Sequence, residues 1–221
     1  MIQKGGGLMY SKPNNIKFCN VSIYLFNKCL IEICQIINHK SNDKSPIRSS
    51  DTFRFYLFTL HNTLILELTK LLEIDNKRRV ENYASLEKLN NKLLNIAGDS
   101  FQIRFDENMK HLLNIRNTSI FNKILTLRDK KVAHVDNSKL INPFTFKVFS
   151  IEEIIELEKI IDIIKLIFNN CLSVFDEEIF LPSFTRTSNL LTFFEEYREF
   201  SHSRPHEFLK WKISIRKDDT L

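Results

Sequence analysis

Residues that interrupt helices are nearly absent from this chain. Among 221 residues there are only 4 glycines and 5 prolines, and three of the glycines form the run Gly5, Gly6 and Gly7. Glycine and proline are the strongest local interruptions of regular structure, so their scarcity favours long helices over many short strands. The sequence therefore predicts an all-α fold.

Apolar residues recur at helical spacing through most of the chain. Ser150 and Glu153 also have the spacing of a capping box at the start of the strongest of these segments. We expect a bundle of about five or six helices. The predicted helices cover residues 16–39, 51–74, 83–97, about 105–133 with a possible bend at Asn117 and Thr118, 151–175 and 186–200.

This pattern also predicts how the chain is divided. Residues 1–15 lack periodicity and read as a flexible lead, residues 16–181 as one helical domain, and residues 182–221 as a C-terminal helix with a polar tail. The composition, 43% hydrophobic and 27% charged, is that of a folded soluble domain. The formal charge of +5 permits an anionic partner such as RNA but does not require one.

Cysteine usage and hydropathy exclude several classes of protein. The four cysteines form no CxxC pair, and three lie on apolar helical faces, so we expect buried free thiols and no metal site. No apolar leader and no charge-free membrane-spanning run is evident, which predicts a cytoplasmic protein with no membrane contact. Nothing in the sequence calls for a cofactor.

Charged and titratable residues gather in the segment LTLRDKKVAHVDNSKL, residues 125–140. On one continuous helix Arg128 and His134 would lie about 240° apart, but a helix that ends near Ala133 would let His134 turn back toward Arg128. A guanidinium beside an imidazole suits a phosphodiester, because one binds phosphoryl oxygens and the other moves a proton near neutral pH. Basic residues in a last helical turn also satisfy unpaired carbonyls, and spacing alone favours that simpler interpretation.

The residues LRDKKVAHVD, 127–136, resemble the signature of the HEPN superfamily (higher eukaryotes and prokaryotes nucleotide-binding), in which an arginine and a polar residue are followed by a histidine a few positions later. The LRDK and AH residues are similar to those of its abortive-infection branch, as are two upstream helical segments, LHNTLILELTKLLEID (60–75) and SLEKL (85–89). The resemblance covers about residues 53–175.

This resemblance implies a helical bundle that dimerises around a shared site, and in many members a metal-independent RNase without a cofactor. His134 would then carry out the proton transfers as the RNA 2′-OH attacks the adjacent phosphate. Arg128 would bind the phosphate, and Asp129 would orient its neighbours. Such a protein would act in prokaryotic defence, by abortive infection or as a toxin with an antitoxin or another defence-system protein as partner.

Three lysines are candidates for RNA contact, namely Lys130 and Lys131 within the motif and Lys123 just before it. Arg104, Lys110 and Arg116 could extend this surface together with Lys123, although such charges more often form a solvated helix face. His61 and His111 have apolar neighbours in helical segments, and we expect each to be a hydrogen-bonded structural residue.

Two features leave other functions open. Asp136 occupies the position where toxins paired with nucleotidyltransferase antitoxins often have a tyrosine, so control by nucleotide transfer to that residue is not expected. Several HEPN proteins are non-catalytic, so the alternative is a helical interaction or nucleotide-binding module. A helical metal enzyme is disfavoured because the paired Glu and Glu-x-x-His ligands of such sites are missing from the sequence.

Overall fold

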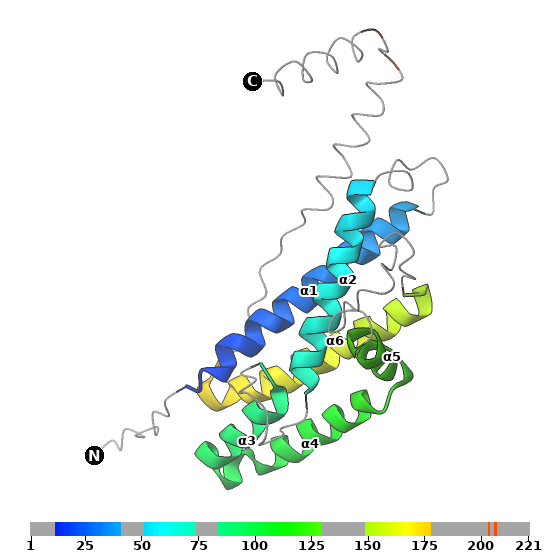
Figure 1. Ribbon diagram of the computed structural model, residues 1–221. Helices are drawn as coiled ribbons and strands as arrows, with labels where there is room; N and C mark the ends of the chain where they lie inside the picture. Colours follow the sequence, from blue (N-terminus) through cyan, green and yellow to red (C-terminus); the bar gives the residue numbers. More distant parts are fainter. Residues whose placement is uncertain are drawn as a thin grey trace, which may run out of the picture.

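The computed structural model describes residues 12–40, 51–73, 84–129 and 149–177, together with the single positions Ser203 and His206. Within these ranges every regular element is helical, which confirms the predicted all-α bundle of five or six helices. The elements are α1 (Asn15–Lys40), α2 (Asp51–Leu72), α3 (Leu86–Ala97), α4 (Asp99–Arg116), α5 (Ser119–Leu127), α6 (Ile151–Leu172) and the short 3₁₀ helix η4 (Ser173–Phe175) (Figure 1).

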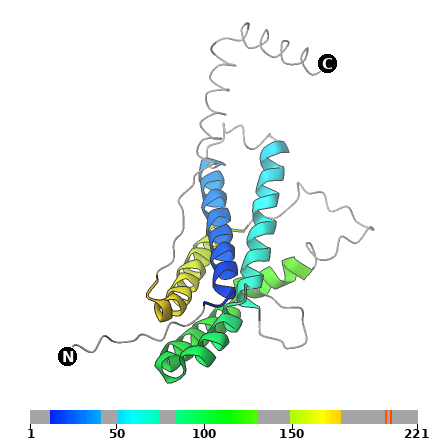
Figure 2. The same cartoon turned by 90° about the vertical axis from the view of Figure 1, so that its left-hand side faces the viewer.

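The first two helices, α1 and α2, form an antiparallel pair and pack side by side along most of their length (Figure 2). Helix α6 crosses this pair and contacts α1, while α3 and α4 pack on each other and on α6. The short helix α5 contacts α2, α4 and α6. This arrangement brings residues from all six helices around one interior.

One apolar cluster fills that interior and runs along the chain from Cys19 to Leu172. Its largest fully buried side chains are Phe26 from α1, Phe101 from α4 and Phe168 from α6. Burial of one such side chain is worth about 1.5–3 kcal/mol, so the core that they share supplies the main force holding the helices together.

The described residues exclude 1–11 and nearly all of 182–221, so the predicted terminal segments stay predictions.

The boundaries of α3, α4 and α5 show one error in the expected helix positions. Gly98 ends α3 as predicted, but α4 begins at Asp99 directly afterwards rather than near Phe105. Gly98 adopts a φ of +57°, a conformation that glycine reaches without strain, so one residue suffices to redirect the chain. The predicted bend at Thr118 is confirmed as a break, because its side chain caps α5 by accepting from the Phe121 amide.

The start of α6 has the predicted capping box. The Ser150 hydroxyl accepts from the backbone N–H of Glu153 at 3.3 Å, and the Ser150 N–H donates to Glu153 Oε2 at 2.8 Å. Both bonds satisfy amides that the helix itself leaves unpaired. The residue before this cap, Phe149, is buried at 5% exposure.

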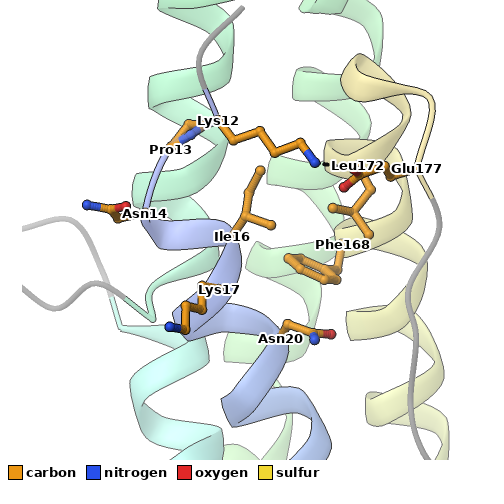
Figure 3. Close-up of a pocket in the computed structure, with 9 residues that line it drawn as sticks. All are labelled: Lys12, Pro13, Asn14, Ile16, Lys17, Asn20, Phe168, Leu172 and Glu177. Carbon is orange, nitrogen blue, oxygen red and sulfur yellow. Dashed lines mark hydrogen bonds and ion pairs between the residues drawn. The ribbon is translucent and has the colours of Figure 1, made fainter.

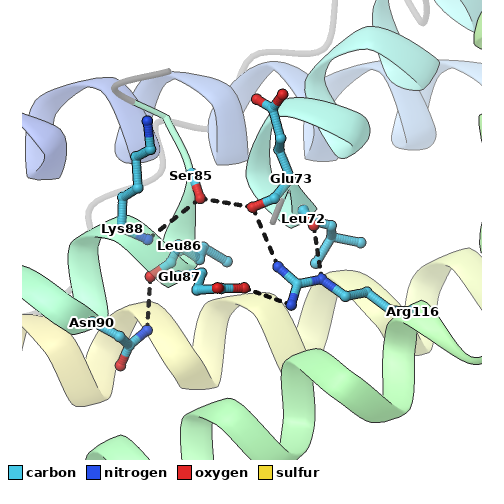
Figure 4. A network of polar contacts seen from close by, with 8 residues as sticks. All are labelled: Leu72, Glu73, Ser85, Leu86, Glu87, Lys88, Asn90 and Arg116. Atoms are coloured by element: carbon cyan, nitrogen blue, oxygen red, sulfur yellow. Dashed lines mark hydrogen bonds and ion pairs between the residues drawn. The ribbon is translucent and has the colours of Figure 1, made fainter. Parts of the chain in front are cut away.

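Arg116 joins three helix ends, which the sequence did not indicate (Figure 4). Its Nε donates to the carbonyl of Leu72 at 2.8 Å and its Nη2 to that of Glu73 at 3.2 Å. Its Nη1 lies 2.6 Å from Glu87 Oε2, and both side chains are only 12% exposed. Arg116 is therefore an internal cross-link between the ends of α2 and α4 and the start of α3, and not part of a solvated face.

A second polar group lies inside the contact of α3, α4 and α6. Asn108 donates to Asn90 Oδ1 at 2.8 Å and accepts from Asn170 Nδ2 at 2.9 Å, while Asn90 donates to the carbonyl of Leu86. Asn90 and Asn108 are fully buried. Buried amides that satisfy one another favour a single register of the helices that carry them.

Helix α1 also reaches the length and hydropathy of a membrane span over Asn15–Ile37. In this fold, however, Cys19, Ile23 and Phe26 are buried in the core that α1 shares with the other helices. Because the core helix of a globular protein meets the same two criteria, this property does not indicate a membrane.

Candidate functional site

Arg128 lies at the C-terminal end of α5, immediately before Asp129. Its Nε and Nη2 both lie 2.8 Å from the same oxygen, Asp129 Oδ1. A guanidinium carries five N–H donors, and among the described residues Asp129 is the acceptor for two of its nitrogens. The Arg128 side chain is 31% exposed and that of Asp129 is 59% exposed. The pair thus presents an oriented, partly exposed guanidinium.

Helix α5 carries this arginine because one of its faces is apolar and is buried. Its nine residues include Ile120, Phe121 and Ile124, all of which lie in the core. Capping by Thr118 starts the helix, and Arg128 follows its last turn as the C-cap, where a cation interacts favourably with the negative end of the helix dipole. These local features place Arg128 at the edge of the bundle.

Lys123 of α5 belongs to a cluster of four side chains. The Lys123 ammonium is 2.5 Å from Glu153 Oε1 and 5.4 Å from the centre of the Phe149 ring. His61 also contacts Phe149: the two rings stack with 5.5 Å between their centroids and an interplanar angle of 28°. We call Lys123, Glu153, Phe149 and His61 the clamp cluster.

His61 has the structural role expected of it. Its ring is fully buried, and Nδ1 lies 2.6 Å from the carbonyl oxygen of Leu57. Because that carbonyl can only accept, the proton of the neutral ring is on Nδ1. Burial lowers the pKa of His61 to about 4, and the bond to Leu57 opposes part of this effect. The ring is therefore neutral at physiological pH and does not supply a proton donor for catalysis.

The described residues contain half of the predicted site. Arg128, Asp129 and Lys123 are described, whereas His134, Lys130 and Lys131 lie outside the described residues. The relation of Arg128 to His134 stays a prediction. Lys123 is 38% exposed, but its charge is already paired with Glu153.

Sequence reasoning missed Phe149 and the second contact of Glu153. Glu153 was identified as a capping residue, yet its other carboxylate oxygen binds Lys123, which is 30 positions away in the chain. No periodicity links residues at that separation, so only the packing of α5 against α6 reveals the pair.

The thiols do not provide a nucleophile. All four cysteines are free; three are buried and Cys34 is partly buried, which confirms most of the prediction made for them. Burial raises the pKa of Cys34 to about 11, with a further contribution from the neighbouring carboxylate of Glu158. Burial raises the pKa of Cys19 and Cys171 still more, so these sulfurs stay protonated at neutral pH.

Two surface cavities lie away from Arg128. One, of about 380 Å³, lies between the start of α1 and the end of α6 (Figure 3). Its lining includes Lys12, Lys17, Asn20, Phe168 and Glu177, and Lys12 forms an ion pair with Glu177. The other, of about 450 Å³, lies between α1 and α6 around Cys34 and Glu158. Within the described part of the chain, no group of three His, Cys, Asp or Glu side chains is arranged to hold a metal ion.

No protein-family model, curated protein or solved structure matches this chain.

Proposed function

We propose that this protein is a metal-independent endoribonuclease of a prokaryotic defence system, acting as a homodimer in which two copies of the motif form one site. The observation that carries the proposal is Arg128, a partly exposed guanidinium that Asp129 holds through its Nε and Nη2. It is the arginine of the residues 127–136 that resemble the HEPN signature.

In this mechanism the RNA supplies its own nucleophile. His134 of one copy accepts the proton of the 2′-OH as the O2′–P bond forms. The bond from phosphorus to the 5′ oxygen then breaks, and the second copy's His134 donates a proton to that oxygen. The products are a 2′,3′-cyclic phosphate and a 5′-OH.

The remaining motif residues support this displacement. Arg128 binds the phosphoryl oxygens and stabilises the charge that develops on them, because a planar guanidinium can contact two oxygens at once. Asp129 holds that guanidinium in one orientation through the two contacts to Oδ1. Lys130 and Lys131 add positive charge for the RNA backbone.

The test is cleavage of total RNA in EDTA by purified wild-type protein and by the His134→Ala and Arg128→Ala variants. We expect His134→Ala to lose activity by about 10²–10⁴-fold, the usual contribution of general acid–base catalysis, and Arg128→Ala by about 10²–10³-fold, the usual cost of removing a group that stabilises developing charge. Arg104→Ala is the matched control, because Arg104 is an exposed arginine near the start of α4. A substrate with a single 2′-deoxy nucleotide at the cut position should resist cleavage at that position.

Two results would count against the proposal in different ways. Equal cleavage by wild type and both variants would refute the site, while leaving an RNase elsewhere in the protein. No cleavage of any RNA by a folded dimer would favour the non-catalytic interaction or nucleotide-binding module.

A further inference from the structure

Helix α5 depends on its neighbours for its position. It has nine residues, and isolated helices shorter than about 12–15 residues are marginal in water. Arg128 ends this helix, so any rotation or tilt of α5 moves the guanidinium. The contacts that hold α5 in place therefore also determine where Arg128 lies.

The clamp cluster supplies such a contact on the side of α6. Lys123 reaches from α5 to Glu153 at 2.5 Å, and its ammonium lies over Phe149. Glu153 is itself held, because its other oxygen, Oε2, accepts from the Ser150 N–H at 2.8 Å. The carboxylate thus joins α5 to the first turn of α6, beside which α5 lies in Figure 1.

The cluster is also attached to α2. Phe149 is 5% exposed and stacks on His61, which is fully buried and bonded to the Leu57 carbonyl. Lys123 and Arg128 are five residues apart on the α5 side, or about 140° around the axis and about 7.5 Å along it. Lys123 therefore holds α5 without occupying the direction in which Arg128 points.

We propose that Lys123 and Glu153 are positioning residues for the ribonuclease site, their ion pair holding α5 against the start of α6 so that Arg128 keeps one position. This inference rests on the proposed function. It assigns Lys123 a role different from the direct RNA contact that its position in the sequence suggested.

The experiment compares Lys123→Met, Glu153→Gln, the double variant and Lys123→Arg in RNA cleavage. Glu153→Gln keeps one oxygen for the Ser150 cap, and it replaces the oxygen that binds Lys123 by an uncharged NH2 group. We expect kcat to fall by about 10–100-fold in both single variants, the range that a displacement of about 1 Å produces, with KM unchanged. The kcat of the double variant should be no lower than that of the less active single variant. Lys123→Arg keeps the positive charge and should have a kcat close to that of the wild type. Lys165→Met, which removes the surface partner of Asp162 on α6, is the matched control.

Direct RNA contact by Lys123 predicts a different result. Lys123→Met would then raise KM and reduce the salt dependence of binding by about one counterion, and Glu153→Gln would have no effect. That outcome would overturn the positioning role.

Hydrogen exchange of the full-length protein separates this inference from the proposed function. Lys123→Met and Glu153→Gln should speed amide exchange in residues 119–129, and Lys165→Met should not. If the wild type cleaves no RNA, the proposed function fails but the clamp is still tested by exchange. Unchanged exchange in both clamp variants, or faster exchange with unchanged kcat, would overturn the inference.

Discussion

His61 couples the stability of the bundle to pH. This side chain of α2 is fully buried and stacks on Phe149, and burial lowers its pKa to about 4 from its ordinary value of 6.5. Above pH 6.5 the ring is neutral in both the folded and the unfolded chain, so it adds no pH dependence. As the pH falls from 6.5 to about 4, the unfolded chain binds the proton first, and the free energy of unfolding decreases.

The size of this effect follows from the two pKa values. Each pKa unit corresponds to about 1.4 kcal/mol, so a fall from 6.5 to about 4 gives about 3 kcal/mol. Below pH 4 both states are protonated and the loss is complete. A loss of this size is a large share of the 5–15 kcal/mol that is typical of a folded domain.

His61→Phe isolates this contribution. Phenylalanine keeps an aromatic ring against Phe149 but cannot bind a proton. Urea unfolding followed by circular dichroism at several values between pH 7 and pH 4 gives the free energy of unfolding of both proteins. We expect the stability of the wild type relative to the variant to fall by about 3 kcal/mol across this range, because the carboxylates titrate alike in both. Parallel pH profiles for the two proteins would refute the assignment of a buried, neutral His61.

Three further measurements test other parts of the fold. Arg116→Ala should lower the free energy of unfolding by about 3 kcal/mol in urea, because it removes the charge beside the nearly buried Glu87 and the contacts to two helix-end carbonyls. Asn108→Leu should cost about 1–3 kcal/mol in the same assay, because its buried amide partners lose their hydrogen bonds. In the folded protein Ellman's reagent should label Cys34 first, and Cys19 only after unfolding, because Cys19 is fully buried.

Most helices could be predicted because their causes are local. The scarcity of glycine and proline and the apolar periodicity located five of them, and the cap at Ser150 was visible as a pattern of two residues. The start of α4 was missed because glycine was taken only as a stop signal. A single Gly98 with φ +57° ends one helix and lets the next begin at once, with Phe101 buried in its first turn.

Interactions between distant parts of the chain could not be predicted in this way. Arg116 resembles any other charged residue in a helical pattern, and its role depends on carbonyls 43 and 44 positions away. The pair Lys123 and Glu153 is hidden for the same reason. By contrast, the pair Arg128 and Asp129 consists of neighbours in sequence, so the candidate motif could be recognised before its surroundings were known.

The charges around the described half of the site bear on how RNA would be held there. Arg128 has Asp129 at 2.8 Å, and Lys123 has Glu153 at 2.5 Å, so each of these two cations is offset by a carboxylate. Attraction to an RNA backbone depends on uncompensated positive charge, because it arises from the release of counterions from phosphates. Under the proposed function Lys130 and Lys131, and the same residues of a second copy, add such charge within the motif. A composite site in a dimer would double this charge, which is a physical reason for a monomer of this protein to bind RNA weakly.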